Sequence, residues 1–108
     1  MGIFEVLADP TRRRIVELLA SRDRIVGELI ETLDLSQPGV SRHLRVLREA
    51  GVVTCEPQGQ RRKYRLAPGS LDELSDWVAS RRQDWTRRLD ALEEYIERRQ
   101  APEEGESA

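Results

Sequence analysis

Residues 35–66 read LSQPGVSRHLRVLREAGVVTCEPQGQRRKYRL, a capped basic helix followed at once by a basic hairpin. The Ser36 hydroxyl can cap the helix, Pro38 suits a first turn in which its missing amide hydrogen costs nothing, and Gly51 is placed to end it. This order predicts a winged helix-turn-helix, in which a recognition helix enters the major groove of DNA and the hairpin forms the wing.

The predicted recognition helix, Gln37 to Ala50, is amphipathic. Val40, Leu44 and Leu47 recur at i, i+4 and i+7 and form one apolar stripe that faces a core. The polar side chains that project away from the stripe are Gln37, Ser41, Arg42 and Arg45. Arg matches guanine O6 and N7, Gln matches adenine N6 and N7, and Ser can serve a base edge or a phosphate. This face therefore predicts contacts to bases in the major groove.

The predicted wing alternates apolar and polar residues on both sides of a turn at Pro57–Gln60. The positions expected to pack inward are Val53, Cys55, Tyr64 and Leu66. The tip, Gln60 to Lys63, suits a sugar-phosphate backbone or the minor groove, where it supplies affinity more than sequence choice.

The charge distribution supports this interpretation. The whole chain has a formal net charge of −2, which by itself argues weakly against nucleic-acid binding, since that binding is driven by release of counterions from phosphates. Residues 36–66, however, carry a net charge of +5, against −2 for residues 1–35 and −5 for residues 70–108. Positive charge is thus concentrated on the predicted DNA-reading segment. The alternative is that the charge run is only a solvated face.

Two further helices are predicted before the recognition helix. The first starts at Asp9-Pro10 and runs to about Ala20, and its core face holds Ile15, Leu18 and Leu19. Arg12 to Arg14 lie in its first turns, where cations oppose the helix dipole, so we expect intramolecular or intersubunit carboxylates, rather than DNA, to compensate them.

The second of these helices, from about Gly27 to Leu33, carries its stripe on Val26, Leu29, Ile30 and Leu33. A tight turn at residues 34–36 joins it to the recognition helix, so it is expected to cross the DNA backbone as the supporting helix. Ile3, Phe4 and Leu7 indicate one more turn or helix at the N-terminus.

A long helix is predicted from Ser70, which forms a capping box with Glu73. Its apolar positions step by three, four and seven: Leu71, Leu74, Val78, Trp85, Leu89, Leu92 and Ile96. So small a domain cannot bury so long a stripe, and Trp77 and Tyr95 lie near it. We expect the stripe to pack against the first helix and against its twin in a second subunit, the alternative being that the helix folds back on its own domain.

Length and composition set the outer limits. The 108 residues predict one domain over residues 1–100 and a disordered acidic tail over 101–108. A core of this size makes dimerisation a natural source of extra burial. No stretch has the length of a membrane span or the pattern of a signal peptide, so a cytoplasmic protein is expected. The single cysteine, Cys55, excludes an internal disulfide framework.

Two separate motifs resemble one known family. The stretch Leu-Ala-Asp-Pro-Thr-Arg-Arg-Arg-Ile within Phe4–Ala20, and Leu35–Val53, are similar to the ArsR family of bacterial winged-helix repressors, and the resemblance covers about residues 3–98. It implies a homodimeric repressor that binds an interrupted inverted repeat at a promoter, often its own. By this likeness the base-contacting positions are Gln37, Pro38, Ser41 and Arg42, the wing tip is Arg61–Lys63, and the first and last helices form the dimer interface.

The sequence departs from the metal-sensing members of that family. These members use a Cys-x-Cys pair before the recognition helix, or Asp and His ligands on the long C-terminal helix. Residues 25–35 contain no cysteine or histidine, and the C-terminal helix contains carboxylates but no histidine. Thiolate or imidazole metal sites therefore cannot be built there. The chain resembles the non-metal branch of the family, and we expect no metal and no cofactor.

The remaining candidates for special chemistry have plainer alternatives. His43, the only histidine, is expected to pack or to contact a phosphate rather than to act as a sensor or ligand. Cys55 is expected to be a small buried hydrophobe, although nearby cations leave a redox switch open. An enzyme is not expected, because a nucleophile and base would have to be assembled around this one histidine and one cysteine. The rival hypothesis is a protein-interaction module that uses the winged helix and the C-terminal helix without specific DNA binding.

The resulting hypothesis is a regulator whose partners are double-stranded DNA and a second copy of the chain, with no membrane partner and no residue set that identifies an inducer. The candidate DNA-binding residues are Ser36, Gln37, Pro38, Ser41, Arg42, His43, Arg45, Gln60, Arg61, Arg62 and Lys63. The candidate dimer-interface residues are Phe4, Leu7, Leu74, Trp77, Val78, Trp85, Leu89, Leu92 and Ile96.

Overall fold

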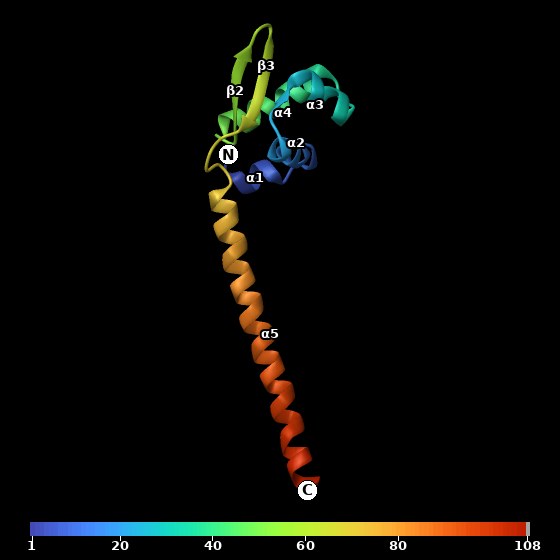
Figure 1. Ribbon diagram of the computed structural model, residues 1–108, viewed down its shortest axis with the longest axis vertical. Helices are drawn as coiled ribbons and strands as arrows, with labels where there is room; N and C mark the ends of the chain where they lie inside the picture. The colour runs from blue at the N-terminus through green and yellow to red at the C-terminus, as the bar shows by residue number, and fades with distance from the viewer. Residues whose placement is uncertain (108) are drawn as a thin grey trace. The chain divides into compact units, whose positions relative to one another are not determined.

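The computed structural model describes the backbone of residues 1–107 and the side chains of residues 1–100. Its elements are α1 (Ile3–Leu7), α2 (Pro10–Ser21), β1 (Arg24–Ile25), α3 (Val26–Leu33), α4 (Gln37–Glu49), β2 (Val53–Gln58), β3 (Arg61–Leu66) and α5 (Asp72–Ser107). Figure 1 shows the five helices and the hairpin of β2 and β3. The predicted fold class is confirmed: an α+β, mostly helical winged helix-turn-helix with a hairpin wing and a long C-terminal helix. The chain divides into two compact units, Met1–Leu74 and Ser75–Ala108. The predicted acidic tail, residues 101–108, falls outside the residues whose side chains are described and stays a prediction.

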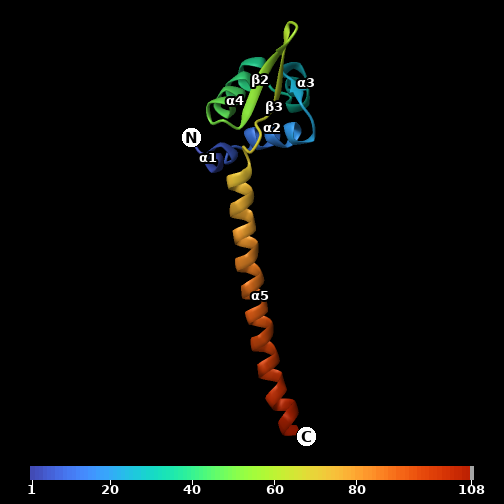
Figure 2. The same ribbon diagram turned by 60° about the vertical axis from the view of Figure 1, so that its left-hand side comes forward.

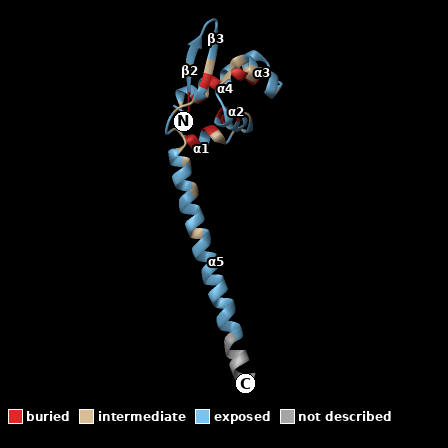
Figure 3. Cartoon of the chain, viewed as in Figure 1, coloured by how far each residue is buried: buried red, intermediate tan, exposed pale blue. Residues whose placement is uncertain are grey.

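One hydrophobic core holds the first unit together. The predicted stripe of the recognition helix lies within it, with Val40, Leu44 and Leu47 no more than 1% exposed. Ile15 of α2 and Leu29 of α3 are fully buried against the same core. Figure 3 shows the buried residues of this unit in red. The remaining core residues are Ile3, Val6, Val16, Leu18, Leu19, Val52, Val53 and Tyr64. The depth of this burial fixes how far α4 can rotate, and therefore which of its side chains face outward.

The sheet has three strands, whereas the sequence predicted a two-stranded hairpin. The strand order is β1-β3-β2, and the two-residue β1 pairs antiparallel with β3, Arg24 opposite Tyr64. A strand of two residues is too short to show an alternating pattern in the sequence. The strand β1 exists only because β3 lies beside it and pairs with it. Figure 2 shows the long hairpin formed by β2 and β3.

The wing turn is tighter than predicted. It consists of Gly59 and Gln60 alone, since Pro57 and Gln58 belong to β2, where Pro57 lies opposite Arg62. Proline is tolerated there because β2 is an edge strand of the sheet. Gly59 has a φ of +63°, a conformation that two-residue hairpin turns demand and that glycine adopts without strain.

The predicted cap at the start of the recognition helix and the predicted stop at its end are both confirmed. The Ser36 hydroxyl accepts a hydrogen bond from the Gly39 amide at 3.2 Å and so begins α4. At the other end, Gly51 has a φ of +76°, its amide donates to the Arg48 carbonyl, and the Val52 amide donates to the Leu47 carbonyl. These paired bonds satisfy carbonyl groups that the last helical turn leaves free.

The predicted start of the last helix is wrong by one residue. Helix α5 begins at Asp72, so Ser70 is not its cap. Ser70 lies instead in a turn closed by hydrogen bonds from the Ser70 amide to the Ala67 carbonyl and from the Asp72 amide to the Gly69 carbonyl. A positive φ of 74° at Gly69 produces this turn, which local sequence alone did not reveal.

We expect Asp9→Ala to lower the free energy of unfolding by about 1 kcal/mol near neutral pH. The Asp9 carboxylate accepts a hydrogen bond from the Arg12 amide at 3.0 Å and so caps α2. This bond holds the pKa of Asp9 below its ordinary value of 3.8. A carboxyl with a lowered folded-state pKa stabilises the fold above its unfolded pKa and loses that contribution as the pH falls through the folded value. Urea unfolding at neutral pH and below pH 3.8 should therefore show the difference between wild type and variant shrinking in acid; a constant difference would contradict this role of the charge.

Candidate nucleic-acid interface

The buried stripe of α4 determines which of its side chains face outward. Gln37, Ser41, Arg45 and Arg48 follow one another at steps of four, four and three residues, so they form one row along the helix, and all four are exposed. Arg42 is exposed on the neighbouring row. Four of the predicted DNA-binding residues of this helix are thus available on its outer side.

A groove of about 710 Å³ brings the start of this row together with the wing. Its walls are formed by β1, α3, the first half of α4 and the tip of the hairpin. The lining residues are Ile25, Val26, Gly27, Glu28, Glu31, Gln37, Ser41, Gln60, Arg61, Arg62 and Tyr64. Five of the candidate DNA-binding residues, from two separate segments of the sequence, therefore line one concave surface.

Other predicted residues lie outside this groove. Ser36 is the cap of α4 and Pro38 lies in its first turn, while Arg42 and Arg45 are exposed on its outer side. His43 is half-buried and lies near Asp9, the cap of α2. This placement supports packing as the role of His43.

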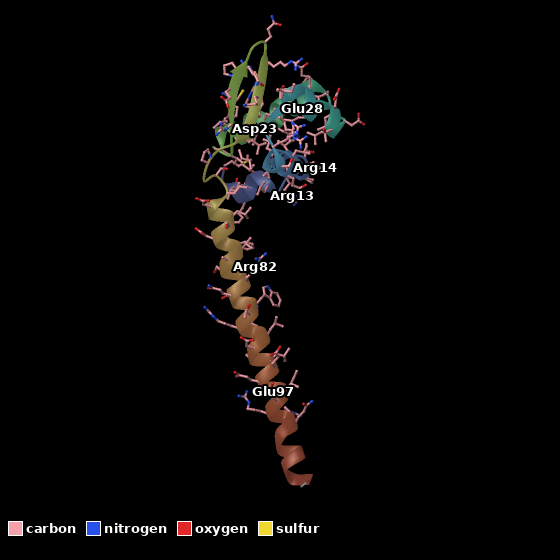
Figure 4. The ribbon with its side chains drawn as sticks, viewed as in Figure 1. Arg13, Arg14, Asp23, Glu28, Arg82 and Glu97 are labelled. Atoms are coloured by element: carbon pink, nitrogen blue, oxygen red, sulfur yellow. The ribbon has the colours of Figure 1, made fainter. Side chains whose placement is uncertain are left out.

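Lys63 differs from the other cations of the wing tip. Its ammonium group lies 3.8 Å from a carboxylate oxygen of Asp23, which is labelled in Figure 4, and 3.9 Å from one of Glu56. Glu56 also accepts a hydrogen bond from Arg65 at 3.3 Å. On this outer face of the wing, which carries Glu56, Lys63 and Arg65, the two cations are thus paired with Glu56 and Asp23 of the same chain. Lys63 is therefore less available to a phosphate than the sequence suggested.

The cations of Met1–Leu74 fall into two sets. Five have a carboxylate oxygen of the same unit within ion-pair distance: Arg12, Arg14, Arg22, Lys63 and Arg65. The predicted intramolecular compensation on α2 is confirmed for Arg12 and Arg14, although Arg12 also donates to the Val6 carbonyl at 2.9 Å. The second set has no ion pair among the described residues: Arg13, Arg24, Arg42, Arg45, Arg48, Arg61 and Arg62.

Five of the seven cations in the second set belong to α4 and the wing tip. Of the other two, Arg24 donates to the Leu18 carbonyl and to Ser21. An exposed guanidinium without a carboxylate partner keeps its hydrogen-bond donors free for a phosphate or a base edge. Free positive charge therefore gathers on α4 and the wing tip.

Sequence reasoning missed three residues of this surface. Glu28 and Glu31 of α3 line the groove, and Arg48 extends the exposed row of α4. Arg48 could have been found, because it follows Arg45 by three residues and Ser41 by seven, a helical spacing. The two glutamates could not, since their place beside the wing depends on how α3 packs.

The carboxylate of Glu28 is engaged within its own unit. It accepts hydrogen bonds from the Arg22 guanidinium and, at 3.1 Å, from the Ile25 amide, and so holds the start of α3. These bonds, that of Arg22 first, lower the pKa of Glu28 below its ordinary value. Glu28 therefore stays ionised and shapes one wall of the groove.

Tyr64 connects the wing to the core. It is 7% exposed and lies opposite Cys55 in the hairpin. Burial, and then the Cys55 thiol, raise the pKa of Tyr64, whereas the nearby Arg48 opposes the rise. Cys55 itself is half-buried and packs against the core, in keeping with a small hydrophobe.

The predicted dimer residues fall into two groups. Leu7 and Leu74 pack at the edge of the core of the first unit. On α5 four apolar side chains, here called the α5 seam, are 45–61% exposed: Trp85, Leu89, Leu92 and Ile96. Steps of four, three and four residues place all four on one side of the helix. Phe4, Trp77 and Val78 are exposed or half-buried.

Two other kinds of site were sought in the described part of the chain. No three side chains of His, Cys, Asp or Glu gather there in a way that could hold a metal ion. No helix in that part combines the length and the apolar character needed to cross a membrane.

Comparison with known proteins identifies the family. Residues 9–54 match the family described as bacterial regulatory protein, arsR family. The chain is 43% identical over 94 residues to the HTH-type transcriptional regulator Rv2034 of Mycobacterium tuberculosis, covering 87% of this chain and 85% of the relative. It is 34% identical over 77 residues to the transcriptional repressor SdpR of Bacillus subtilis, covering 71% and 86%.

A solved structure shows the same arrangement of elements. The homodimeric winged helix-turn-helix DNA-binding domain of Mb0332 from Mycobacterium bovis superposes with a TM-score of 0.62 at 26% identity, covering 76% of each chain. The predicted family resemblance is thus confirmed from motif, relatives and fold together. This chain belongs to the ArsR family of winged helix-turn-helix transcriptional regulators, a family of DNA-binding proteins rather than enzymes.

Proposed function

We propose that the protein is a homodimeric repressor that binds an interrupted inverted repeat at its own or a neighbouring promoter in the bacterial cytoplasm and blocks transcription sterically. The observation that carries this proposal is the set of five guanidiniums on α4 and the wing tip that have no carboxylate partner among the described residues; two of them, Arg61 and Arg62, line the same groove as Gln37 and Ser41. Released counterions supply the affinity of such a surface for DNA, and the side chains of α4 supply the sequence choice.

In this proposal α4 lies in the major groove. Gln37, Ser41 and Arg42 contact base edges, while Arg61 and Arg62 of the wing hold the adjacent backbone. The second subunit places its own helix in the next major groove on the same side, about 34–36 Å away.

The acidic wall of the groove sets the direction of approach. Glu28 and Glu31 lie on the α3 side of the groove; Glu28 is paired with Arg22, whereas Glu31 has no ion pair among the described residues. Carboxylates repel phosphates, so we expect the DNA backbone to follow the wing side of the groove and not the α3 side.

The α5 seam is proposed as the main contact between the two subunits. Residues 81–88 of α5 hold four arginines and one acid, whereas residues 90–97 hold four acids and no cation. Arg82 and Glu97, labelled in Figure 4, belong to these two segments. An antiparallel pair centred on Leu89 sets each basic segment beside the acidic segment of the twin, whereas a parallel pair sets like charges together. The charge pattern therefore favours an antiparallel pairing of α5 with a second copy.

Fluorescence anisotropy tests the proposed function. DNA from immediately upstream of the gene and random DNA of equal length are titrated with the protein across a salt series. A repressor prefers the upstream DNA and loses affinity steeply as salt rises. Absence of binding to either DNA would refute the proposal and favour a protein-interaction module.

We expect Arg62→Ala to weaken binding to specific and random DNA alike, and to reduce the slope of log affinity against log salt by about 1. Arg62 lines the groove and has no carboxylate partner within the described part of the chain, so its natural partner is a phosphate. Arg65→Ala is the matched control, because Arg65 lies on the same strand but is paired with Glu56. Equal losses in the two variants would contradict the distinction between free and neutralised cations.

A further inference from the structure

A second, smaller hollow of about 310 Å³ lies between the wing and the last turn of α4. Its lining residues are Arg48, Cys55, Pro57, Gly59, Gln60, Arg61 and Arg62. Three of the seven are arginines and none is acidic. Such a concentration of like charge in one concavity is unfavourable unless an anion enters it.

No ion pair among the described residues explains Arg48, although its side chain interacts with that of Tyr64. Its side chain is exposed, and no carboxylate of the described residues is within ion-pair distance of it. It lies in the last turn of α4, where a cation is favourable to the helix dipole, but this effect requires no particular orientation. The neighbouring Tyr64 is buried and fixed by the sheet, so it limits where the Arg48 side chain can lie.

The other two arginines of the hollow are neighbours at the start of β3 in the wing. Arg62 lies opposite Pro57 on the strand pair, and Arg61 follows directly after the turn at Gly59-Gln60. Both line the hollow as well as the larger groove. The hairpin thus brings two arginine residues to the wall of the hollow that Arg48 of the recognition helix also lines.

We propose that Arg48, Arg61 and Arg62 form an oxyanion site that holds one phosphate group between the wing and the end of α4. Guanidinium groups present paired N–H donors that match the oxygens of a phosphate, and three of them can share one group. The phosphate can come from the DNA backbone, which rests on the proposed function, or from a small phosphate-bearing molecule that competes with DNA. In either case Arg48 clamps the wing to the recognition helix when the site is filled.

Two titrations at constant ionic strength test the site. Inorganic phosphate, exchanged against chloride, is added to the free protein and followed by the NMR signals of the arginine Nε–H groups. The same exchange is then made in the complex with upstream DNA and followed by anisotropy. Arg48→Gln is compared with wild type and with Arg65→Gln, which removes the same charge from the outer face of the wing. Thermal unfolding checks that each variant is folded.

If a backbone phosphate fills the site, Arg48→Gln weakens binding to all DNA and reduces the salt slope by about 1, Arg65→Gln does not, and inorganic phosphate leaves the complex intact. If a free anion fills it, phosphate shifts the arginine signals and releases DNA from wild type and Arg65→Gln, but not from Arg48→Gln. If Arg48→Gln matches wild type in both titrations, the site is refuted while DNA binding by the wild type still supports the proposed function. If wild type binds phosphate through Arg48 but binds no DNA, the site holds and the proposed function fails.

Discussion

Trp85→Glu is expected to separate the dimer into monomers and to lower the affinity for an inverted-repeat operator by about 10²- to 10⁴-fold. Trp85 is 61% exposed within its own chain and lies on the α5 seam with Leu89 and Leu92. A carboxylate at this position must lose its water when a second apolar seam covers it, and that loss opposes association. A monomer then binds one half-site without the benefit of a linked second contact.

The measurement has two parts, sedimentation for the oligomeric state and anisotropy for operator binding. Gln83→Glu is the matched control, because it adds the same charge on the side of α5 opposite the seam. It should stay dimeric and bind DNA as wild type does. A wild-type protein that is monomeric in solution, or a Trp85→Glu variant that remains dimeric, would refute the assignment of the seam.

Arg42→Ala is expected to cost about 1–3 kcal/mol of discrimination between operator and random DNA, or about 5- to 150-fold. Arg42 is exposed on α4 beside Ser41, has no carboxylate partner among the described residues, and is long enough to reach a base edge. Because a base contact exists only on the correct sequence, its loss lowers specific binding far more than random binding.

Competition titrations with both DNAs measure this difference, and the Arg62→Ala variant provides the contrast. The two variants remove the same charge from one surface, but one is expected to change the ratio of the two affinities and the other to change both affinities equally. A parallel loss on both DNAs for Arg42→Ala would remove this residue from base reading and make it a phosphate contact.

The outline of the site was predictable because it depends on near neighbours in the chain. The caps at Asp9 and Ser36 are satisfied by amide groups three residues away, and the end at Gly51 needs only a positive φ. The stripe of α4 follows from a period of 3.6 residues. Local interactions of this kind are written directly into a sequence.

The start of α5 and the extent of the wing turn were less predictable. Ser70 and Glu73 have the spacing of a capping box, yet a glycine turn at Gly69 delays the helix to Asp72. Pro57 indicates a turn in most settings, but here it belongs to an edge strand. In both cases two local signals competed: the turn at Gly69 decided the start of α5, and the pairing of β2 with β3 decided the extent of the wing turn.

The sequence by itself determined the order of the elements, the buried and exposed sides of α4, the concentration of cations on α4 and the wing, and the apolar periodicity of α5. Only the tertiary structure decided which cations remain free. Asp23 and Glu56 neutralise Lys63, whereas Arg48, Arg61 and Arg62 meet around a hollow without a carboxylate. The physical reason is a difference in range. Helical periodicity and capping act over a few residues of the chain. An ion pair within the wing or a groove requires distant segments to approach each other, and the packing of the core sets that approach.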